Sequence, residues 1–342
     1  MSDYIKSSFN SGVLEPTKKV DETQFENKLR PQTLDEYVGQ QKIKDNLKIY
    51  VEAAKKRGEP LDHILFYGPP GLGKTTLSYI IANELGARIK LTSGPAISRS
   101  ADMASVLNNL GEGDVLFIDE IHRLNKNIEE ILYPAMEDFV LDFVIGKGPS
   151  AKSMRINLPH FTLIGATTKV GNISNPLRDR FGVVDRLEFY SEEELEQIIK
   201  RSAKILDVTI TDNAAKILSR RSRQTPRIAN RLLKRIRDFA ELLNNGVIDD
   251  DLVNKALLKL EVDEKGLNHS DIEYLKVLNE KFNGGPVGVE TLAAAMSEDT
   301  ATLEDVIEPF LMQIGFVSRS MRGRMLNEIG KKHLEEYYKK NK

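Results

Sequence analysis

The chain has 342 residues, enough for two or three domains with a substantial hydrophobic core, and its 40% apolar and 29% charged residues exclude collagen-like and low-complexity chains. The lack of cysteine excludes disulfides, thiolate metal sites and cysteine nucleophiles, and the five histidines (63, 122, 160, 269 and 333) are not spaced as zinc ligands. With 49 basic and 51 acidic residues, the net charge of −2 does not itself indicate a nucleic-acid partner, although a local basic region can still bind one.

The start of the chain is polar. Residues 1–24 lack apolar periodicity and the basic and apolar regions of a signal peptide, so we expect a flexible leader on a cytoplasmic chain. We expect no membrane-spanning segment. The longest run without a charge, Ile156–Thr168, has 13 residues, and a spanning helix needs about 20 apolar residues.

Between residues 25 and 190, short apolar runs alternate with helical patterns. This alternation predicts a parallel sheet with helices on both faces, because strands buried on both sides are continuously apolar. The runs that indicate buried strands are His63–Tyr67, Ile89–Leu91, Val115–Ile118 and Phe161–Ala166. We therefore expect an α/β domain over this part of the chain.

The segment Gly68–Thr75 matches the phosphate-binding pattern G-x-x-x-x-G-K-[ST] in full, between a predicted strand and a helical pattern. Glycines such as Gly71 and Gly73 let backbone N–H groups wrap around phosphates, and the helix N-terminus adds its positive end. Lys74 is expected to reach the β- and γ-phosphates, and the hydroxyl of Thr75 to bind Mg²⁺. The pattern predicts a nucleotide site.

A second candidate feature follows the strand at Val115–Ile118, which ends in Asp119 and Glu120. Ligands bind at the carboxyl ends of strands in open α/β sheets, so Asp119 is expected to hold Mg²⁺ through water and Glu120 to polarise the attacking water. These roles predict hydrolysis of the nucleotide. The two acids could also simply cap a strand end, and Asp119–His122 also matches the acidic motif of D-E-x-H helicases.

Two further motifs lie downstream. Thr167 and Thr168 follow the last predicted strand and could bind the γ-phosphate or the attacking water; they could equally be turn threonines. Arg178 and Arg180 flank Asp179. An arginine supplied by a neighbouring subunit can stabilise the transition state on the γ-phosphate, and a surface pair with Asp179 is the alternative.

From about residue 191 to 260 the pattern is helical throughout. Ser191, followed by three glutamates, is typical of a helix start. Pro226 suits the first position of a later helix, which puts Arg227 in the first turn, where a cation is electrostatically unfavourable. A nearby polyphosphate would explain it.

The last 75 or so residues, after a linker at residues 263–266, have the helix–turn–helix–strand rhythm of a winged helix. The predicted recognition helix, Thr302–Gln313, carries Glu304, Asp305 and Glu308, and three acids form a poor surface for phosphates. The basic segment Arg319–Arg324 is the better DNA contact, through Arg319, Arg322 and Arg324. A solvated basic turn is the alternative interpretation.

Taken together, these motifs resemble AAA+ ATPases, and their order resembles the RuvB family in particular. The resemblance covers about residues 25 to 330, and only the phosphate-binding pattern is common to many NTPases. The strings that carry it are Leu29–Pro31, Val38–Gln40, Gly68–Thr76, Asp119–Leu124, Ile164–Thr168, Leu177–Gly182, Thr225–Leu232 and Gly284–Gly288.

The resemblance implies an AAA+ P-loop domain with a parallel sheet over residues 25–190, a small all-helical lid domain over 191–261 and a C-terminal winged-helix domain over 264–342. It implies a ring, usually a hexamer, that uses ATP to pump double-stranded DNA. Such a ring drives branch migration of four-way Holliday junctions in recombination and DNA repair. A RuvA-type junction-binding protein loads the ring, and a RuvC-type resolvase acts in the same complex.

The resemblance also implies roles for individual residues. Those assigned to the phosphates, Mg²⁺ and hydrolysis are Gly71, Lys74, Thr75, Thr76, Asp119, Glu120, Thr168 as first sensor, Arg180 as the finger reaching the next subunit, and Arg227 as second sensor. Those assigned to the rest of the nucleotide are Leu29 and Arg30 over the adenine, Tyr190 at the hinge, and Glu137, Asp138 and Phe139. Arg319 and Arg324 match positions assigned to DNA, and the predicted β-hairpin at residues 141–158 matches the element that grips RuvA, although a half-buried hairpin without a partner would show the same alternation.

Three other functions remain to be weighed. A clamp-loader-like AAA+ subunit shares the phosphate loop, sensors and finger but ends in a helical collar. A D-E-x-H helicase requires a second α/β motor domain, whereas residues 191–342 are predicted to be helical. A binding module with an inactive nucleotide site requires a missing base or finger, and both are present in this sequence.

Overall fold

The structure is a computed structural model that describes residues 27–145 and 152–340. The predicted leader, residues 1–24, lies outside these ranges. The chain divides into two compact units: one ends at Ile198 and also includes Thr225–Arg227, and the other comprises Ile199–Gln224 and the chain from Ile228 onwards. No helix in the described ranges is both long and apolar enough to cross a membrane.

The first unit is built on a five-stranded parallel sheet with the strand order β2-β3-β6-β1-β7. The strands are β1 (Ile64–Tyr67), β2 (Ile89–Ser93), β3 (Val115–Asp119), β6 (Thr162–Thr167) and β7 (Val183–Arg186). The four strands predicted from the sequence are confirmed. The fifth, β7, was missed because it is a short, half-exposed edge strand whose sequence, VVDR, is not a continuous apolar run.

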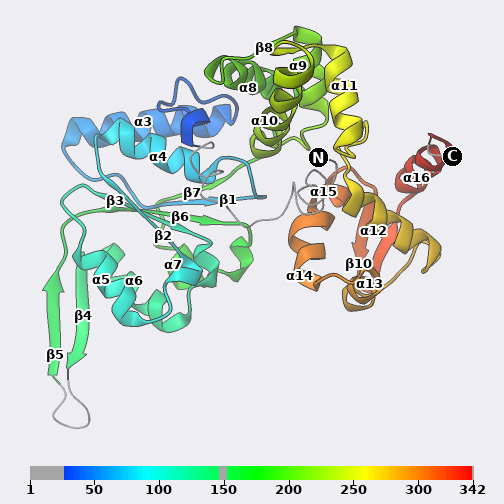
Figure 1. The fold of residues 1–342 in the computed structure, drawn as a ribbon. Helices are drawn as coiled ribbons and strands as arrows, with labels where there is room; N and C mark the ends of the chain where they lie inside the picture. The colour runs from blue at the N-terminus through cyan, green and yellow to red at the C-terminus, as the bar shows by residue number, and fades with distance from the viewer. Residues whose placement is uncertain (1–26, 146–151, 341–342) are drawn as a thin grey trace, which may run out of the picture. The chain divides into compact units, whose positions relative to one another are not determined.

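Helices cover both faces of this sheet, as predicted. Figure 1 shows α3 and α4 on one face and α5, α6 and α7 on the other. Their bounds are α3 (Gln41–Arg57), α4 (Lys74–Leu85), α5 (Ser100–Asn108), α6 (Lys126–Glu137) and α7 (Asn175–Arg178). Leu163 of β6 is fully buried in a core cluster with Leu132 and Ala135 of α6. Truncating such a leucine to alanine costs about 2–5 kcal/mol of stability, so this core holds the strand ends in place.

A β-hairpin leaves this unit, as the sequence predicts. Strands β4 (Val140–Ile145) and β5 (Lys152–Asn157) are antiparallel, and Figure 1 shows them extending away from the sheet. At the base Leu141 is buried, and on the hairpin surface Arg155 donates two hydrogen bonds to Asp142, at 2.8 and 2.9 Å. Met154 is exposed. The base is therefore anchored in the core while the hairpin surface faces solvent.

The lid is helical, as predicted, with two additional two-residue strands. Its elements are α8 (Glu192–Ile205), β8 (Thr209–Ile210), α9 (Asp212–Arg220), α10 (Pro226–Leu243), β9 (Val247–Ile248) and α11 (Asp250–Lys259). The predicted helix start at Ser191 is confirmed. The backbone N–H of Glu194 donates to Ser191 Oγ at 3.2 Å, and the Ser191 N–H donates to the Glu194 carboxylate at 2.8 Å.

The C-terminal part has the winged-helix arrangement expected from the sequence. Its elements are α12 (His269–Glu280), α13 (Val289–Met296), α14 (Thr300–Thr302), a π-helical turn at Leu303–Ile307, α15 (Glu308–Gln313), β10 (Val317–Ser320), β11 (Gly323–Leu326) and α16 (Glu328–Lys340). The hairpin β10–β11 is the wing. The core of the whole winged-helix part includes three fully buried leucines, Leu275, Leu292 and Leu311.

Two of the three acids in the predicted recognition helix are bound by an arginine of the wing. Glu308 is only 2% exposed, and its carboxylate accepts a hydrogen bond from Arg324 Nε at 2.9 Å. Glu304 accepts one from Arg324 Nη2 at 2.7 Å. The turn of π-helix shifts the helical phase at this point. Glu304, 34% exposed, and the buried Glu308 bind the wing, while Asp305 is exposed.

Candidate functional site

The loop between β1 and α4 depends on its glycines. Gly68, Gly71 and Gly73 have φ values of 138°, 81° and 100°, which favour residues without a Cβ. A Cβ on Gly68 would lie 2.6 Å from the Leu187 carbonyl oxygen, and one on Gly73 would lie 2.7 Å from the Tyr37 hydroxyl. The loop is therefore packed closely against its neighbours and shaped by backbone groups.

Lys74, the first residue of α4, is buried in this loop with 8% of its surface exposed. Its ammonium group donates to the carbonyl oxygens of Gly68 at 2.7 Å and Pro69 at 2.8 Å. Burial lowers the pKa of Lys74 to about 8; nearby Asp119 opposes this decrease and Arg227 adds to it. A phosphate would supply the negative charge that favours the protonated form, so this position suits a polyphosphate.

The carboxyl ends of three strands bring the predicted acids and threonines together. β6 lies between β3, which ends in Asp119, and β1, which leads into the phosphate loop. Thr168 is exposed directly after β6, and the buried Thr167 places its Oγ1 2.9 Å from Nδ1 of His122. Thr167, at the end of β6, thus contacts His122 in the turn after β3. His122 is the fourth residue of the D-E-x-H match noted in the sequence.

Glu120 follows Asp119 with a left-handed φ of 49°, which turns the chain sharply at the end of the strand. Its carboxylate accepts a hydrogen bond from Arg123 Nη1 at 3.1 Å. Asp119 Oδ1 accepts the backbone N–H of Glu120 at 3.0 Å. The two carboxylates therefore have different partners: that of Asp119 accepts the next backbone N–H, and that of Glu120 accepts from a guanidinium.

Two tyrosines support the phosphate loop. The hydroxyl of Tyr190 donates to the Leu72 carbonyl at 3.1 Å and lies 2.7 Å from the hydroxyl of Tyr37. Burial raises the pKa of both hydroxyls, so both stay protonated as donors. The sequence singled out Tyr190 but not Tyr37, which immediately precedes the Val38–Gln40 string.

That string has a structural explanation. Gly39 has φ 83°, and a Cβ there would lie 2.6 Å from the Tyr190 ring. The side chain of Gln40 donates to the Glu188 carbonyl at 2.6 Å and accepts from its N–H at 3.0 Å. The string therefore fixes the backbone that carries Tyr190.

Three more residues were predicted near the nucleotide: Leu29, Arg30 and Arg227. Leu29 is buried, and the guanidinium of Arg30 lies 4.7 Å from the ring centre of Tyr79 on α4. Arg227 belongs to the segment that packs with this unit: a Cβ built on Gly71 would lie 3.1 Å from its Cβ. The structure thus brings Arg227 against the loop that carries Lys74.

Arg180 lies at a different edge of the same unit. Its guanidinium donates to the Glu137 carboxylate at 2.7 Å and to the Pro176 carbonyl at 2.6 Å, and lies 4.6 Å from the ring centre of Tyr133. The carboxylate partner of Arg180 is therefore Glu137, and not the adjacent Asp179 that the sequence suggested.

Glu137, Asp138 and Phe139, predicted as one stretch, have three different environments. Glu137 binds Arg180, and Asp138 caps the C-terminus of α6. Phe139 packs edge-on against His160 and Phe161, with ring centres at 4.5 and 5.7 Å. Only the first of the three is directly bonded to another predicted site residue.

The three arginines of the wing also differ. Arg319 and Arg324 face each other across β10 and β11, and Arg322 is exposed at the turn between them. Arg319 is exposed and lies 3.5 Å from Glu304. Arg324 is 5% exposed, with its guanidinium bound by Glu304 and Glu308, so in this conformation the wing offers Arg319 and Arg322 to solvent.

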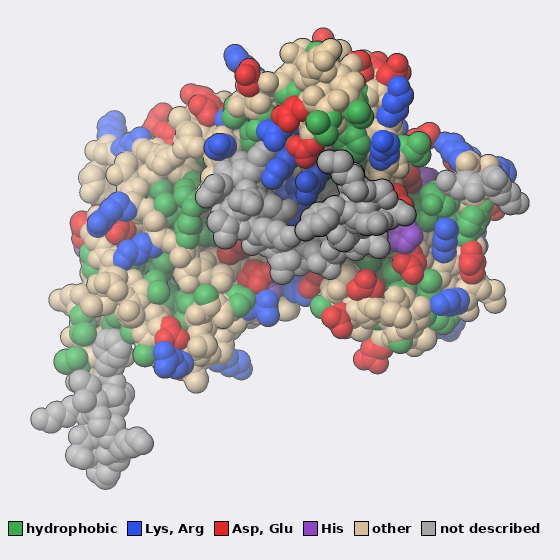
Figure 2. Space-filling model, in the orientation of Figure 1, with side chains coloured by type: hydrophobic (Ala, Val, Ile, Leu, Met, Phe, Trp, Pro, Cys, Tyr) green, Lys and Arg blue, Asp and Glu red, His purple; other side chains and the backbone are tan. Residues whose placement is uncertain are grey.

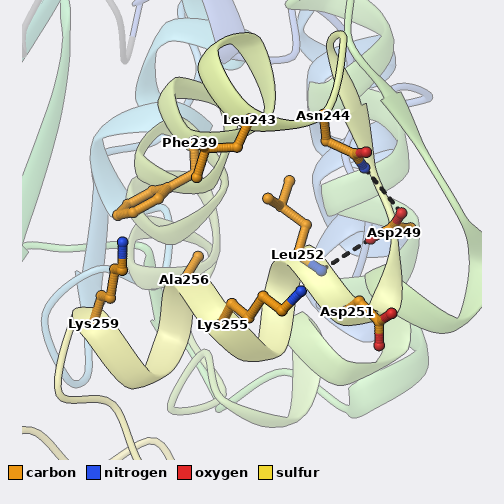
Figure 3. Close-up of a pocket in the computed structure, with 9 residues that line it drawn as sticks. All are labelled: Phe239, Leu243, Asn244, Asp249, Asp251, Leu252, Lys255, Ala256 and Lys259. Carbon is orange, nitrogen blue, oxygen red and sulfur yellow. Dashed lines mark hydrogen bonds between the residues drawn. The ribbon is translucent and has the colours of Figure 1, made fainter.

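A separate pocket of about 330 Å³ lies on the lid between α10 and α11, as Figure 3 shows. Its lining residues are Phe239, Leu243, Asn244, Asp249, Asp251, Leu252, Lys255, Ala256 and Lys259. The rim is fixed by Asp249, which accepts from the Asn244 amide and the Leu252 N–H, both at 2.9 Å. Its floor is apolar, unlike the carbonyl-lined surroundings of Lys74.

Charges are mixed over the surface. In the view of Figure 2, Lys and Arg (blue) and Asp and Glu (red) are interspersed over the molecule, in keeping with its net charge of −2. This face therefore offers no large, purely basic surface to a polyanion.

Models of protein families match nearly the whole described chain. Residues 29–187 match the Holliday junction DNA helicase RuvB P-loop domain, residues 190–263 the RuvB AAA lid domain, and residues 264–335 the RuvB C-terminal winged helix domain. Together they span more than half of the chain and support the fold class predicted from the sequence.

Solved structures agree with these matches. The Thermotoga maritima RuvB Holliday junction branch migration motor is 49% identical in sequence, with a TM-score of 0.83, and the alignment covers 90% of this chain and 98% of that one. Two mutants of the same T. maritima protein match with the same identity and coverage and with TM-scores of 0.83 and 0.82. The chain belongs to the RuvB family.

Proposed function

We propose that this chain is an ATP-hydrolysing motor that moves double-stranded DNA and drives branch migration of Holliday junctions in recombination and DNA repair. The observation that carries the proposal is the buried Lys74 near Asp119, in a chain that ends in a winged helix with exposed arginines. The T. maritima relative is named as such a motor. A clamp loader would carry a helical collar in place of the winged helix.

The chemistry of hydrolysis falls to groups at the carboxyl edge of the sheet. The loop N–H groups of Gly71, Gly73 and Thr76 and the ammonium group of Lys74 bind and orient the phosphates. The hydroxyl of Thr75 and the carboxylate of Asp119 are oxygen donors of the kind Mg²⁺ prefers, and bound Mg²⁺ neutralises phosphate charge. These donors fit the metal.

Glu120 is proposed as the general base. Its carboxylate accepts the proton of the attacking water, for which it must leave the hydrogen bond to Arg123. Thr168, directly after the strand between the two motifs, orients that water or the γ-phosphate. Arg227, against Gly71, senses the phosphates from the lid side.

The rest of the nucleotide is assigned to Leu29 and Arg30 over the adenine and to Tyr190 at the hinge. The contact of Arg30 with Tyr79 on α4 supports this, because it places the N-terminal segment along the helix that opens at Lys74. Tyr190 acts through the Leu72 carbonyl, so its part is to position the loop.

Arg180 is proposed as a finger that completes the nucleotide site of a neighbouring subunit in a hexameric ring. Glu137 supports this role because it holds the guanidinium at 2.7 Å and keeps the side chain at the edge of the unit. In the ring, the triphosphate would replace Glu137 as the anionic partner. Asp138 and Phe139 fix the backbone beside it.

The lid pocket is proposed as part of the contact between copies of this chain. Leu243, which lines the pocket, and Leu242 and Leu258 on the same two helices are 65%, 86% and 78% exposed, which is a large apolar surface to leave in water. A finger acting between subunits requires such a second copy. Substituting Leu243→Glu and Leu258→Glu should reduce the assembled fraction in analytical ultracentrifugation.

The hairpin β4–β5 is proposed to dock a RuvA-type junction-binding protein. Its buried base and exposed surface, including Met154, suit an arm that reaches a partner. Three predictions from the sequence stay predictions. They are a RuvC-type resolvase in the same complex, a cytoplasmic location, and the domain boundaries 25–190, 191–261 and 264–342.

The wing is proposed as the DNA contact, through Arg319 and Arg322 in the observed conformation. Such contacts with phosphate are independent of sequence, which a translocating motor needs. Arg324 supports the wing from inside and could join the contact only by leaving Glu304 and Glu308.

The deciding experiment uses a labelled synthetic four-way junction and a simple tailed fork, each with Mg²⁺–ATP, with and without a RuvA-type partner. We expect the junction and not the fork to dissociate, and the Glu120→Gln variant to bind ATP without dissociating the junction. Hydrolysis of ATP with neither substrate processed would contradict the motor and favour the clamp-loader alternative.

A further inference from the structure

A buried ion pair outside the nucleotide site joins the lid to the winged helix within the second unit. Arg223, in the turn between α9 and α10, is 8% exposed, and Asp271 on α12 is 1% exposed. The guanidinium of Arg223 donates to the Asp271 carboxylate and, through Nε, to the Gly266 carbonyl at 2.8 Å. It also lies 5.2 Å from the ring centre of Phe310 on α15.

Burying this ion pair costs folding free energy, and helix capping alone does not explain why it is buried. Burial raises the pKa of Asp271, and the Arg223 charge only partly opposes this. Asp271 already completes a capping box with Asn268, whose N–H it accepts at 2.8 Å. An apolar pair of the same size would often stabilise the fold as well or better, so a buried pair here is best explained by the fixed geometry that it imposes.

The surrounding turn is tied down at several more points. Arg223 and Gln224 both have a left-handed φ, 49° and 54°. The side chain of Gln224 accepts a hydrogen bond from Gln313 at the end of α15. A Cβ on Gly266 would lie 2.7 Å from the Arg221 carbonyl oxygen, so the linker passes directly against the turn. The turn is thus fixed to the linker and to two helices of the winged helix.

The same turn leads directly into the nucleotide-sensing segment. Arg227 follows Arg223 by four residues, and Thr225–Arg227 packs with the unit that carries the phosphate loop. One short stretch of chain therefore contacts the phosphate loop at one end and the winged helix at the other.

We propose that Arg223 and Asp271 are positioning residues that fix the lid and the winged helix as one body, so that a displacement of Arg227 by the nucleotide is transmitted to the DNA-contacting wing. This inference rests on the proposed function, because it concerns the coupling between that ATP site and that DNA site. Coupling of this kind requires an element whose arrangement both sites influence, and the segment at residues 221–227 contacts the phosphate loop through Arg227 and the winged helix through Arg223 and Gln224.

The test begins with a distance measurement, which the cysteine-free chain allows without removing native thiols. Spin labels on Lys216→Cys in α9 and Glu335→Cys in α16, both exposed, report the geometry between lid and winged helix by double electron–electron resonance. We expect one narrow distance distribution that is the same without nucleotide, with ADP and with a non-hydrolysable ATP analogue. The isosteric Asp271→Asn variant should broaden it, because Arg223 then lacks its counter-charge.

The second readout is the stimulation of ATP turnover by duplex DNA. In Asp271→Asn and Arg223→Lys we expect turnover without DNA to be unchanged and the stimulation to fall by about fivefold or more. The matched control is Lys340→Ala, which breaks the exposed 2.8 Å pair between α16 and Glu264 of the linker and should change neither readout.

Two outcomes would overturn the proposal. The first is a wild-type distance that changes with nucleotide, and the second is an Asp271→Asn variant that keeps both the narrow distribution and full stimulation. If instead the proposed function were wrong, ATP turnover by the wild-type protein would not respond to DNA at all. The spin-label distances would still show whether Arg223 and Asp271 fix the lid and the winged helix as one body. A melting curve distinguishes a folded variant from an unfolded one, and only folded variants are compared.

Discussion

The hydroxyls of Tyr37 and Tyr190 lie 2.7 Å apart, and Tyr190 donates to the carbonyl of Leu72 inside the phosphate loop. The two residues are 153 positions apart in the chain, so this contact ties the N-terminal segment and the start of the lid to the loop. It positions the residue between Gly71 and Gly73 without touching the phosphates.

Substituting Tyr190→Phe should therefore weaken ATP binding without changing the chemistry. Loss of one buried hydrogen bond of about 0.5–1.5 kcal/mol corresponds to a roughly 2–12-fold increase in Kd, with kcat at saturating ATP little changed. Calorimetric titration with ATP measures it. Tyr338→Phe, which removes a hydroxyl bound to the exposed Glu280, is the control and should leave the Kd unchanged. A fall in kcat with an unchanged Kd would contradict the positioning role.

The pKa of Lys74, lowered to about 8 by burial, gives ATP binding a pH dependence. ATP phosphates favour the protonated ammonium group, so binding raises this pKa and takes up a proton above pH 8. The affinity for ATP should therefore fall as pH rises from about 8 to 10, by up to tenfold per unit, and this dependence should vanish below pH 7. Without nucleotide, the pH dependence of folding stability has the opposite sign. The folded state favours neutral Lys74, so the contribution of Lys74 to the free energy of unfolding increases as pH rises from about 8 to 10.

Calorimetry in two buffers of different ionisation enthalpy measures the proton uptake directly. Lys74→Arg is the control, because arginine stays protonated throughout and should abolish the uptake. An equal uptake in both proteins would assign the titration to another group.

Arg180→Ala tests the finger. ATP should bind with unchanged affinity, because the guanidinium is bound to Glu137 and not to the chain's own phosphate loop. Turnover should fall about 10³-fold or more if the finger acts on a neighbour's nucleotide. Arg178→Ala is the matched control on the other side of Asp179.

Mixed assemblies test whether the site is shared. Arg180→Ala subunits retain an intact phosphate loop and Lys74→Ala subunits retain an intact finger, so mixing them should restore part of the activity. No recovery in a mixture shown to co-assemble would argue against a site formed between subunits.

Much of this fold could be read from local sequence, because its signals are short-range. The continuous apolar strands, the phosphate loop and the Ser191 helix start all lie within a few residues of chain. Edge strand β7 was missed because its half-exposed residues give no such signal. The Tyr37–Tyr190 and Arg180–Glu137 contacts join residues far apart in the chain, and no local pattern specifies which long-range partner a polar side chain finds.

The wing shows the same limit most clearly, because its three arginines look alike in sequence and differ in environment. Arg322 is exposed, so Arg322→Ala should weaken duplex DNA binding almost equally for all sequences and reduce the salt slope by about 1, with no change in melting temperature. Arg324→Ala removes the counter-charge of buried Glu308, which keeps only the hydrogen bond from the Tyr274 hydroxyl at 3.1 Å, and should destabilise the fold by about 3–5 kcal/mol. Thermal unfolding and salt-dependent fluorescence anisotropy measure both effects. The double variant Arg324→Met with Glu308→Leu, which leaves no buried charge, should recover most of the lost stability; if it does not, Arg324 supports the wing by packing and not by charge.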